Sequence, residues 1–174
     1  LDNYLTDGGI YNIEFTGESA FEFEIIKVVI PHVMYDITPP TISIGTKPAI
    51  NKPEFFFTTD EPLSAGYVEW IPFPSSSHQD TIHRIAMTND ELQLGIKQFI
   101  ILDNQTPLLD SAEYTLQLTA FDRAKNSSFF QAEELILYDI SPPLVYMYYP
   151  LSNTYVNHLE VQVEASEVLA SGQI

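Results

Sequence analysis

Cysteine is absent from the 174 residues, which excludes disulfides, cysteine-zinc sites and thiol chemistry. Basic residues are scarce, with 7 Lys plus Arg against 24 Asp plus Glu, and the formal net charge is −17. Such a surface repels phosphate backbones and anionic lipid, so we expect no nucleic-acid binding. Solubility is the simplest interpretation of the acidity, and divalent-cation binding is the more specific one. The sequence also lacks an apolar run of about 18 residues, so it predicts no membrane-spanning segment.

Patterns typical of an active site are missing as well. The four histidines do not show the spacing of metal ligands on a helix, and there is no Gly-rich phosphate loop or nucleophile elbow. We expect no enzymatic activity. One histidine, His83, falls within a predicted strand and is expected to be half-exposed.

The sequence contains an internal repeat. The stretch Tyr35–Pro40 (YDITPP) returns as Tyr138–Pro143 (YDISPP), 103 residues later, and the same distance separates Tyr11 from Tyr114. Forward of the prolines, Asp60–Gly66 matches Ser166–Gly172 at a distance of 106 residues, which implies three extra residues in the later copy. A period of about 100 residues is far longer than a solenoid repeat, so each copy is expected to be a domain with its own core.

The repeat divides the chain into three parts. Residues 1–36 are predicted to be the C-terminal part of one repeat, residues 37–139 a complete repeat, and residues 140–174 the N-terminal part of the next. We therefore expect the chain to be a portion of a longer protein. Hydrophobic residues make up 45% of the sequence and aromatic residues 13%, which is ample for folded cores.

Alternating apolar and polar residues predict an all-β fold. In the complete repeat, Phe55 and Phe57 are expected to face inward, as are Val68 and Trp70, while 45–53 and 72–79 are predicted loops and 88–92 a helical turn. Pro31 should end a strand or mark an edge. Seven strands in about 100 residues predict a two-sheet Greek-key sandwich. The predicted strands are 5–16, 21–29, 41–44, 54–58, 67–71, 81–87, 96–102, 114–120 and 129–138.

Tyr114 follows Leu108–Glu113 and leads into the sixth strand of the complete repeat. This arrangement predicts a tyrosine corner, in which the phenol oxygen hydrogen-bonds to backbone a few residues upstream. Ordinary aromatic packing is the alternative, and neither interpretation bears on function.

Three stretches carry a resemblance to a known family: Tyr35–Pro40, Asp60–Trp70 and Tyr114–Asn126. They are similar to the tandem immunoglobulin-like repeats of large bacterial surface proteins, which also resemble fibronectin type III and cadherin-like modules. The resemblance covers the whole chain. It implies tandem immunoglobulin-like Greek-key β-sandwiches, one complete and two partial.

The same resemblance implies a role. Relatives of this kind form extracellular stalks or spacers that hold an adhesive tip away from the cell surface, and their partners are neighbouring repeats or a cell-surface ligand. The alternative is a subunit of a surface filament, with inter-chain contacts through Tyr146, Tyr148 and Tyr149. A carbohydrate-binding module is a weaker alternative, because it needs an exposed aromatic platform and Trp70 is predicted to be buried.

Two positions depart from the family pattern. Lys125 stands where the family's turn usually has glycine. The first copy has Gly17-Glu18-Ser19 at this turn and lacks the aspartate found at Asp122. A role assigned to Asp122 is therefore not expected in the copy before it.

Acidic residues are expected to gather at one pole of the complete sandwich. The loops after its second and sixth strands should lie beside the entering junction, which would bring Asp36, Asp60, Glu61 and Asp122 together. Oxygen ligands from several segments are what Ca²⁺ requires, so these four residues are a candidate Ca²⁺ site. In the alternative, Asp36 and Asp122 only cap turns, and Arg123 or Lys125 pairs with the carboxylates.

The junction Asp36–Pro40 is too short for a flexible linker. Its two prolines fix φ and favour an extended chain, so neighbouring repeats should meet end to end with limited bending. The expected object is a semi-rigid rod.

Overall fold

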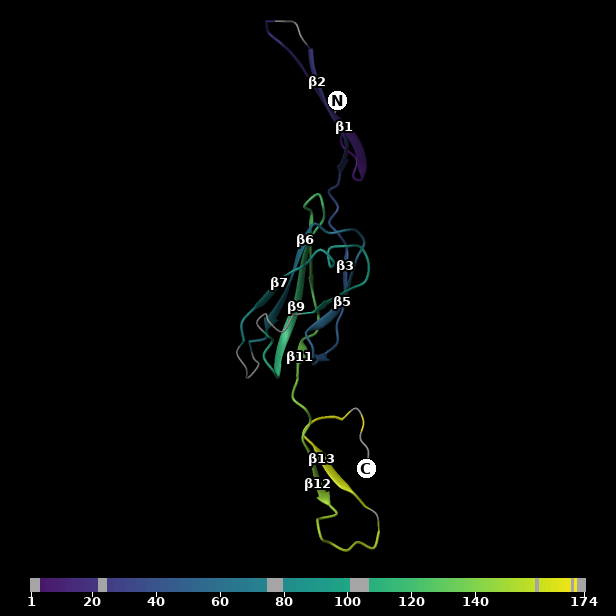
Figure 1. The fold of residues 1–174 in the computed structure, drawn as a ribbon, viewed down its shortest axis with the longest axis vertical. Coiled ribbons are helices and arrows are strands. Elements are labelled where there is room, and N and C mark those ends of the chain that lie inside the picture. The colour runs from purple at the N-terminus through teal and green to yellow at the C-terminus, as the bar shows by residue number, and fades with distance from the viewer. Residues whose placement is uncertain are drawn as a thin grey trace.

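The computed structural model describes residues 4–21, 25–74, 80–100, 107–158, 160–169 and 171. Three parts follow one another along the long axis: a two-stranded hairpin, a central β-sandwich and a second hairpin (Figure 1). No described residue lies in a helix, and none therefore belongs to a helix that could span a membrane. The all-β class expected from the alternating pattern is confirmed.

The first hairpin pairs β1 (Gly9–Glu18) with β2 (Ile25–Tyr35) in antiparallel register. We expected Pro31 to end the pairing or to mark an edge, but β2 continues to Tyr35. The ladder skips Pro31 and His32 as a bulge and resumes where Tyr11 faces Val33. His32 has a φ of +58°, and its amide donates to Asn12 Oδ1 at 3.1 Å. A bulge accommodates proline because the bulged residue is left out of the ladder.

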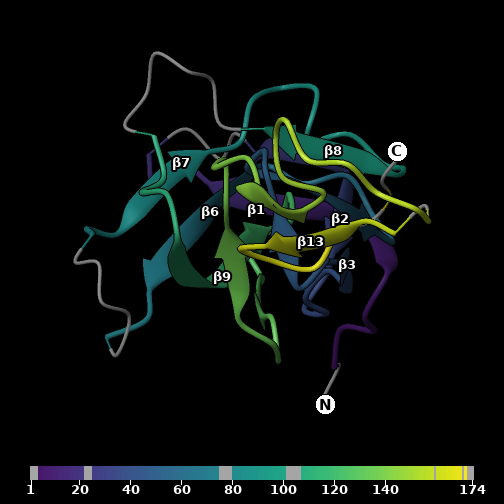
Figure 2. The same cartoon turned by 90° about the horizontal axis from the view of Figure 1, so that it is seen from below.

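The central part contains two sheets. The smaller sheet has the strand order β3-β5-β8, and the larger has β4-β11-β9-β6-β7 with β10 also paired to β9. Viewed along the long axis, β6, β7 and β9 lie on one side and β3 and β8 on the other (Figure 2). The bounds are β3 Ile42–Gly45, β4 Ala49–Ile50, β5 Glu54–Thr59, β6 Ala65–Pro72, β7 His83–Ala86, β8 Lys97–Ile100, β9 Ala112–Phe121, β10 Ser127–Gln131 and β11 Ile136–Tyr138.

One hydrophobic core lies between these sheets. Phe55 from the smaller sheet meets Trp70 from the larger one edge to face, with ring centroids 6.2 Å apart. Trp70 also meets Tyr114 at 6.3 Å, and all three side chains are buried. The predicted inward positions are therefore confirmed. Other buried members of the core include Phe57, Val68, Phe99, Leu116, Leu118 and Ile136.

Two predicted segments differ in detail. Residues 45–53, expected to be a loop, include β4, which pairs in parallel with β11. The strand predicted over 129–138 is divided into β10 and β11, and both pair with β9. The segment 88–92 is a turn in which the Leu92 amide donates to the Thr88 carbonyl at 3.2 Å. Residues 101–102 of a predicted strand and 75–79 of a predicted loop lie outside the described residues.

The predicted tyrosine corner is confirmed at Tyr114. Its phenol oxygen accepts the Leu109 amide at 2.8 Å and donates to Asp80 Oδ2. The first hairpin has the same arrangement, since the Tyr11 phenol oxygen accepts the Thr6 amide at 2.7 Å. Burial and the hydrogen bond to Asp80 raise the pKa of Tyr114, so the phenol remains protonated as the donor.

His83 is buried, with 6% of its surface exposed, so the expectation of a half-exposed side chain is wrong. Its Nε2 atom lies 2.8 Å from Asp80 Oδ2, and its ring meets that of Tyr114 at 6.3 Å. A polar side chain can be buried when it has such a partner. Burial tends to raise the pKa of Asp80, but the bonds from Tyr114 and His83 outweigh it and the pKa is lowered.

The second hairpin pairs β12 (Val145–Tyr149) with β13 (Gln162–Ala165). From Val145 to Met147 its register repeats that of β3 with β5, and beyond Met147 the ladder shifts at a bulge. Val145 faces Ala165 as Ile42 faces Thr59, and Met147 faces Val163 as Ile44 faces Phe57. These positions are 103 residues apart on the first strand and 106 on the second, the distances found in the sequence.

Candidate cation site and junction contacts

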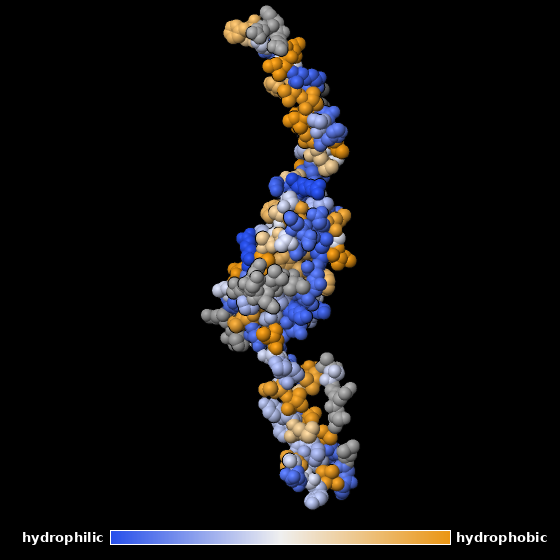
Figure 3. Space-filling view, viewed as in Figure 1, coloured by the Kyte–Doolittle hydropathy of each residue, from blue (hydrophilic) through white to orange (hydrophobic). Residues whose placement is uncertain are grey.

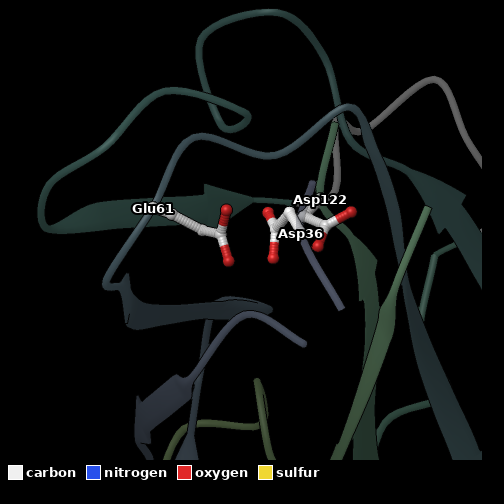
Figure 4. Close-up of side chains that lie close together, drawn as sticks. All are labelled: Asp36, Glu61 and Asp122. Atoms are coloured by element: carbon white, nitrogen blue, oxygen red, sulfur yellow. The ribbon is translucent and has the colours of Figure 1, made fainter. Parts of the chain in front are cut away.

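Three of the four predicted ligands lie together. Asp36 follows β2, Glu61 follows β5 and Asp122 follows β9, and one carboxylate oxygen from each lies within 4.8 Å of the other two. Figure 4 shows the three carboxylates facing one another from separate segments. They stand where the chain enters the sandwich.

Asp122 is fully buried, and its turn explains its orientation. Its Oδ1 atom accepts the Asn126 amide at 2.8 Å, and its Oδ2 atom accepts Asn126 Nδ2 at 2.7 Å. The predicted capping role is therefore present. Asp36 caps in the same manner, because its Oδ1 atom accepts the Thr38 amide at 3.1 Å.

Asn126 connects this turn to the junction, a role that sequence reasoning missed. Its Nδ2 atom also donates to the Asp36 carbonyl at 3.1 Å. The signal in the sequence was the spacing from Asp122 to Asn126, which suits an aspartate that closes a turn on itself. The same contact positions Asp36 beside Asp122.

Lys125 has a φ of +76°, a backbone region that glycine adopts more readily than other residues. Its Nζ atom lies 3.2 Å from Ser64 Oγ. Within the described part of the chain, no ion pair joins Arg123 or Lys125 to a carboxylate of the cluster. The predicted pairing that would neutralise the carboxylates is thus not found among these residues.

Glu61 experiences the accumulated negative charge. Burial is the largest cause of a raised pKa for Glu61, and the negative charges of Asp122, Asp36 and Asp60 raise this pKa further. A divalent cation would offset that repulsion, and Ca²⁺ takes six to eight oxygen ligands, so backbone carbonyls or water would have to complete the shell. Asp36, Glu61 and Asp122 are thus the residues that could hold a cation.

Asp60 does not belong to this group. Its Oδ1 atom accepts the Thr41 amide at 2.7 Å, and this hydrogen bond lowers its pKa. The side chain thereby fixes the start of β3 against the end of β5.

Two further aspartates hold the junctions, a role that sequence reasoning missed. Asp7 Oδ1 accepts the Ile37 amide at 2.8 Å, and Asp7 Oδ2 accepts the Thr38 hydroxyl. Asp110 Oδ1 accepts the Ile140 amide at 2.8 Å, and Asp110 Oδ2 accepts the Ser141 hydroxyl at 2.7 Å. We call each set an aspartate clasp.

The hydroxyl donors lower the pKa of both clasp carboxylates, and the Ile37 and Ile140 amides lower it further. A main-chain bond accompanies each clasp: the Gly8 amide donates to Tyr35 and the Ser111 amide to Tyr138, each at 2.8 Å. Gly8 and Ser111 both have positive φ. The sequence signal that could have revealed the clasps is again the spacing, since Asp7 and Asp110 are 103 residues apart and thus occupy the same position in two copies of the repeat.

The second junction contains a cleft of about 430 Å³. Asp139 and Glu167, at the positions that match Asp36 and Glu61, both line it. Lys47 and Lys52 from the sandwich line the same cleft. Basic and acidic side chains thus meet around this junction.

Comparisons of the chain with protein-family models, with curated proteins and with solved structures gave no match. Any functional conclusion therefore depends on the fold, the contacts above and the sequence resemblance.

Proposed function

We propose that this chain is a segment of tandem immunoglobulin-like β-sandwich repeats, with junctions after residues 36 and 139, that acts as a semi-rigid stalk or spacer for adhesion. One observation carries the proposal: the aspartate clasps at Asp7 and Asp110 make the same contacts 103 residues apart. The tyrosine corners at Tyr11 and Tyr114 follow the same spacing. The extracellular location on a bacterial surface comes from the sequence resemblance alone.

Stiffness at a joint requires that the connecting residues be held in place. At the first junction, Ile37 and Thr38 are bonded to Asp7, Thr38 also to Asp36, and the next two residues are prolines with fixed φ. The second junction repeats these features: the Ser141 amide donates to Asp139 Oδ1 at 3.0 Å, and two prolines follow. Few backbone torsions are left free to bend the rod.

Divalent-cation binding is a second candidate function, supported by the carboxylates of Asp36, Glu61 and Asp122 at the first junction. Since these residues come from both sides of the junction, an ion bound to them would add a further restraint. A surface-filament subunit is the alternative to a spacer. Trp70 is fully buried and offers no platform for a carbohydrate.

Small-angle X-ray scattering on the whole chain tests the spacer proposal. A stiff rod gives a pair-distance distribution with a long tail and a cross-section set by the sandwich, and the curve should fit one extended conformation. A curve that needs a broad ensemble of bent conformations would contradict the proposal. Measurement below the concentration at which copies associate keeps this test separate from any self-assembly.

A further inference from the structure

Two lysines lie on the loop that carries β4, at the end of the sandwich from which the chain leaves. They are Lys47 and Lys52, and both line the cleft at the second junction. A main-chain bond fixes this loop against the exiting chain, since the Asp139 amide donates to the Ile50 carbonyl at 2.9 Å. The two lysines are therefore held beside the junction.

Two carboxylates line the same cleft, those of Asp139 and Glu167. Asp139 directly follows β11, and Glu167 lies in the loop after β13. The residue before Glu167 is fixed by a pair of hydrogen bonds, because the Ser166 amide donates to the Leu144 carbonyl and the Ser166 hydroxyl accepts the Leu144 amide, each at 2.9 Å. Leu144 follows the two junction prolines, so these bonds place Glu167 near the junction as well.

The charges around this cleft are complementary. The sequence has 7 basic residues in 174, and two of them are on this one short loop. The sandwich also contributes Glu54 to the cleft, but its Oε2 atom accepts Gln98 Nε2 at 2.8 Å. Among the described residues, neither Lys47 nor Lys52 forms a direct ion pair, so any attraction to Glu167 acts across the cleft.

The first junction indicates why positive charge is needed at this place. Asp139 and Glu167 match Asp36 and Glu61, which lie in the carboxylate cluster at the entry to the sandwich. Crowding of like charges in that cluster is unfavourable, and a nearby cation of any kind offsets it. A lysine ammonium supplies such a charge as part of the chain itself.

We propose that Lys47 and Lys52 attract Glu167 across the second junction and thereby limit its bending. We call these three residues the charge latch. The proposal rests on the spacer role and deepens it, because it identifies the β4 loop of one repeat as the partner of the entry loop of the next. The molecule narrows between the sandwich and the second hairpin, and hydrophilic residues lie beside this narrow part (Figure 3).

The strength of the latch depends on salt. Exposed opposite charges attract one another weakly, so the latch should narrow the range of angles at the joint without changing the stability of the sandwich. The screening length is about 14 Å at 0.05 M salt and about 4 Å at 0.5 M salt. The latch should therefore act at the lower salt concentration and be lost at the higher one.

Pulsed electron paramagnetic resonance on the whole chain tests the latch. Spin labels on Asp90→Cys and Tyr155→Cys report the distance between the sandwich and the second hairpin. With all other residues unchanged, we expect one narrow distance peak at about 0.05 M salt and a broader distribution at about 0.5 M salt.

Charge reversal on either side of the cleft should produce the same broadening at low salt. One variant carries Lys47→Glu and Lys52→Glu, and another carries Glu167→Lys, so that like charges face each other in both. Combining all three substitutions brings opposite charges together again and should restore the narrow peak, which no loss of packing would do. Arg123→Glu is the matched control, since it reverses an exposed positive charge at the opposite end of the sandwich and should leave the peak narrow.

The outcomes separate the latch from the spacer role. A distribution that stays broad in the combined variant would overturn the latch, and so would equal broadening in Arg123→Glu. A narrow peak in every variant would also overturn it while leaving the spacer role intact, because the clasps and prolines would then hold the joint alone. A broad distribution at low salt without charge reversal would contradict both proposals.

Discussion

Asp110 accepts the Ile140 amide at 2.8 Å, and this bond joins the turn before β9 to the chain that leaves the sandwich. Thirty residues separate the two positions. The bond fixes the direction in which the chain leaves the sandwich, although Asp110 is not itself a residue of the junction. Asp7 and Ile37 have the same relationship at the entry.

Removing a clasp should loosen its joint without unfolding the sandwich. In Asp110→Ala, the Ile140 amide and the Ser141 hydroxyl lose their acceptor, so we expect a wider spread of angles between the sandwich and the second hairpin. Because the chain has no cysteine, spin labels on Asp90→Cys and Tyr155→Cys report this spread as a distance distribution by pulsed electron paramagnetic resonance. Both labelled positions are exposed.

Glu134→Ala is the matched control for that experiment, because it removes an exposed carboxylate from the loop between β10 and β11. It should leave the distance distribution unchanged. Equal broadening in both variants would show that the clasp does not restrain the joint.

Acid should open the clasps. The folded pKa of Asp7 and of Asp110 lies below the ordinary value of 3.8, so each clasp is stabilising above that value and its contribution is lost as pH falls through the lower folded pKa. The distance distribution should therefore be constant from about pH 7 to about pH 5 and broaden only below about pH 4. Broadening between pH 7 and pH 5 would contradict this assignment, and Asp110→Ala should lack the acid transition at the second joint.

The tyrosine corner predicts a stability loss in Tyr114→Phe. Without the hydroxyl, the Leu109 amide and the Asp80 carboxylate both lose a partner in a buried region, so we expect the free energy of unfolding to fall by about 1–3 kcal/mol. Urea denaturation followed by the fluorescence of Trp70, the single tryptophan, measures the change. Tyr155→Phe, at a fully exposed position, should be neutral, and an equal loss there would remove the corner as the cause.

The variant Glu61→Gln distinguishes two effects at the first junction: repulsion among the carboxylates, and binding of a cation by them. Since the pKa of Glu61 is raised in the folded protein, its ionisation weakens folding as pH rises above 4.5. Removing the charge should therefore raise the melting temperature at pH 7 in a chelator. Calorimetry with and without calcium checks this change directly.

In the wild type, calcium should raise the melting temperature, and in Glu61→Gln this gain should be reduced or lost. Asp60→Asn is a useful comparison, because Asp60 lies outside the cluster and should leave the calcium response in place while weakening the start of β3. A wild type whose melting temperature is unchanged in millimolar calcium would exclude the cation site.

The fold was predictable where apolar and polar residues alternate and where the sequence repeats. Phe55, Phe57 and Trp70 lie inside the sandwich as their alternation predicts, because side-chain direction follows directly from the pleat. His83 was misjudged because its burial depends on Asp80 and Tyr114, and Tyr114 lies far along the chain. The bulge at Pro31 and His32 was missed because Asn12, whose side chain accepts the His32 amide, is on the other strand.

The candidate site was predictable for a similar reason. The loop positions follow from the order of strands, so Asp36, Glu61 and Asp122 were correctly grouped. The fourth predicted ligand, Asp60, points away because the Thr41 amide binds it, a detail that topology does not determine. The clasps at Asp7 and Asp110 depend on turn geometry, although their spacing was visible in the repeat.

The parallel pairing of β4 with β11 has a mechanical consequence. The chain enters the sandwich through β3 at one pole and leaves through β11 at the other, where Leu137 and Tyr138 of β11 face Ala49 and Ile50 of β4. Tension applied along the long axis pulls β4 and β11 past each other in opposite directions. The hydrogen bonds between these two strands therefore bear the load together and do not open one after another. A pulled segment should therefore resist extension in shear before any strand peels from the larger sheet.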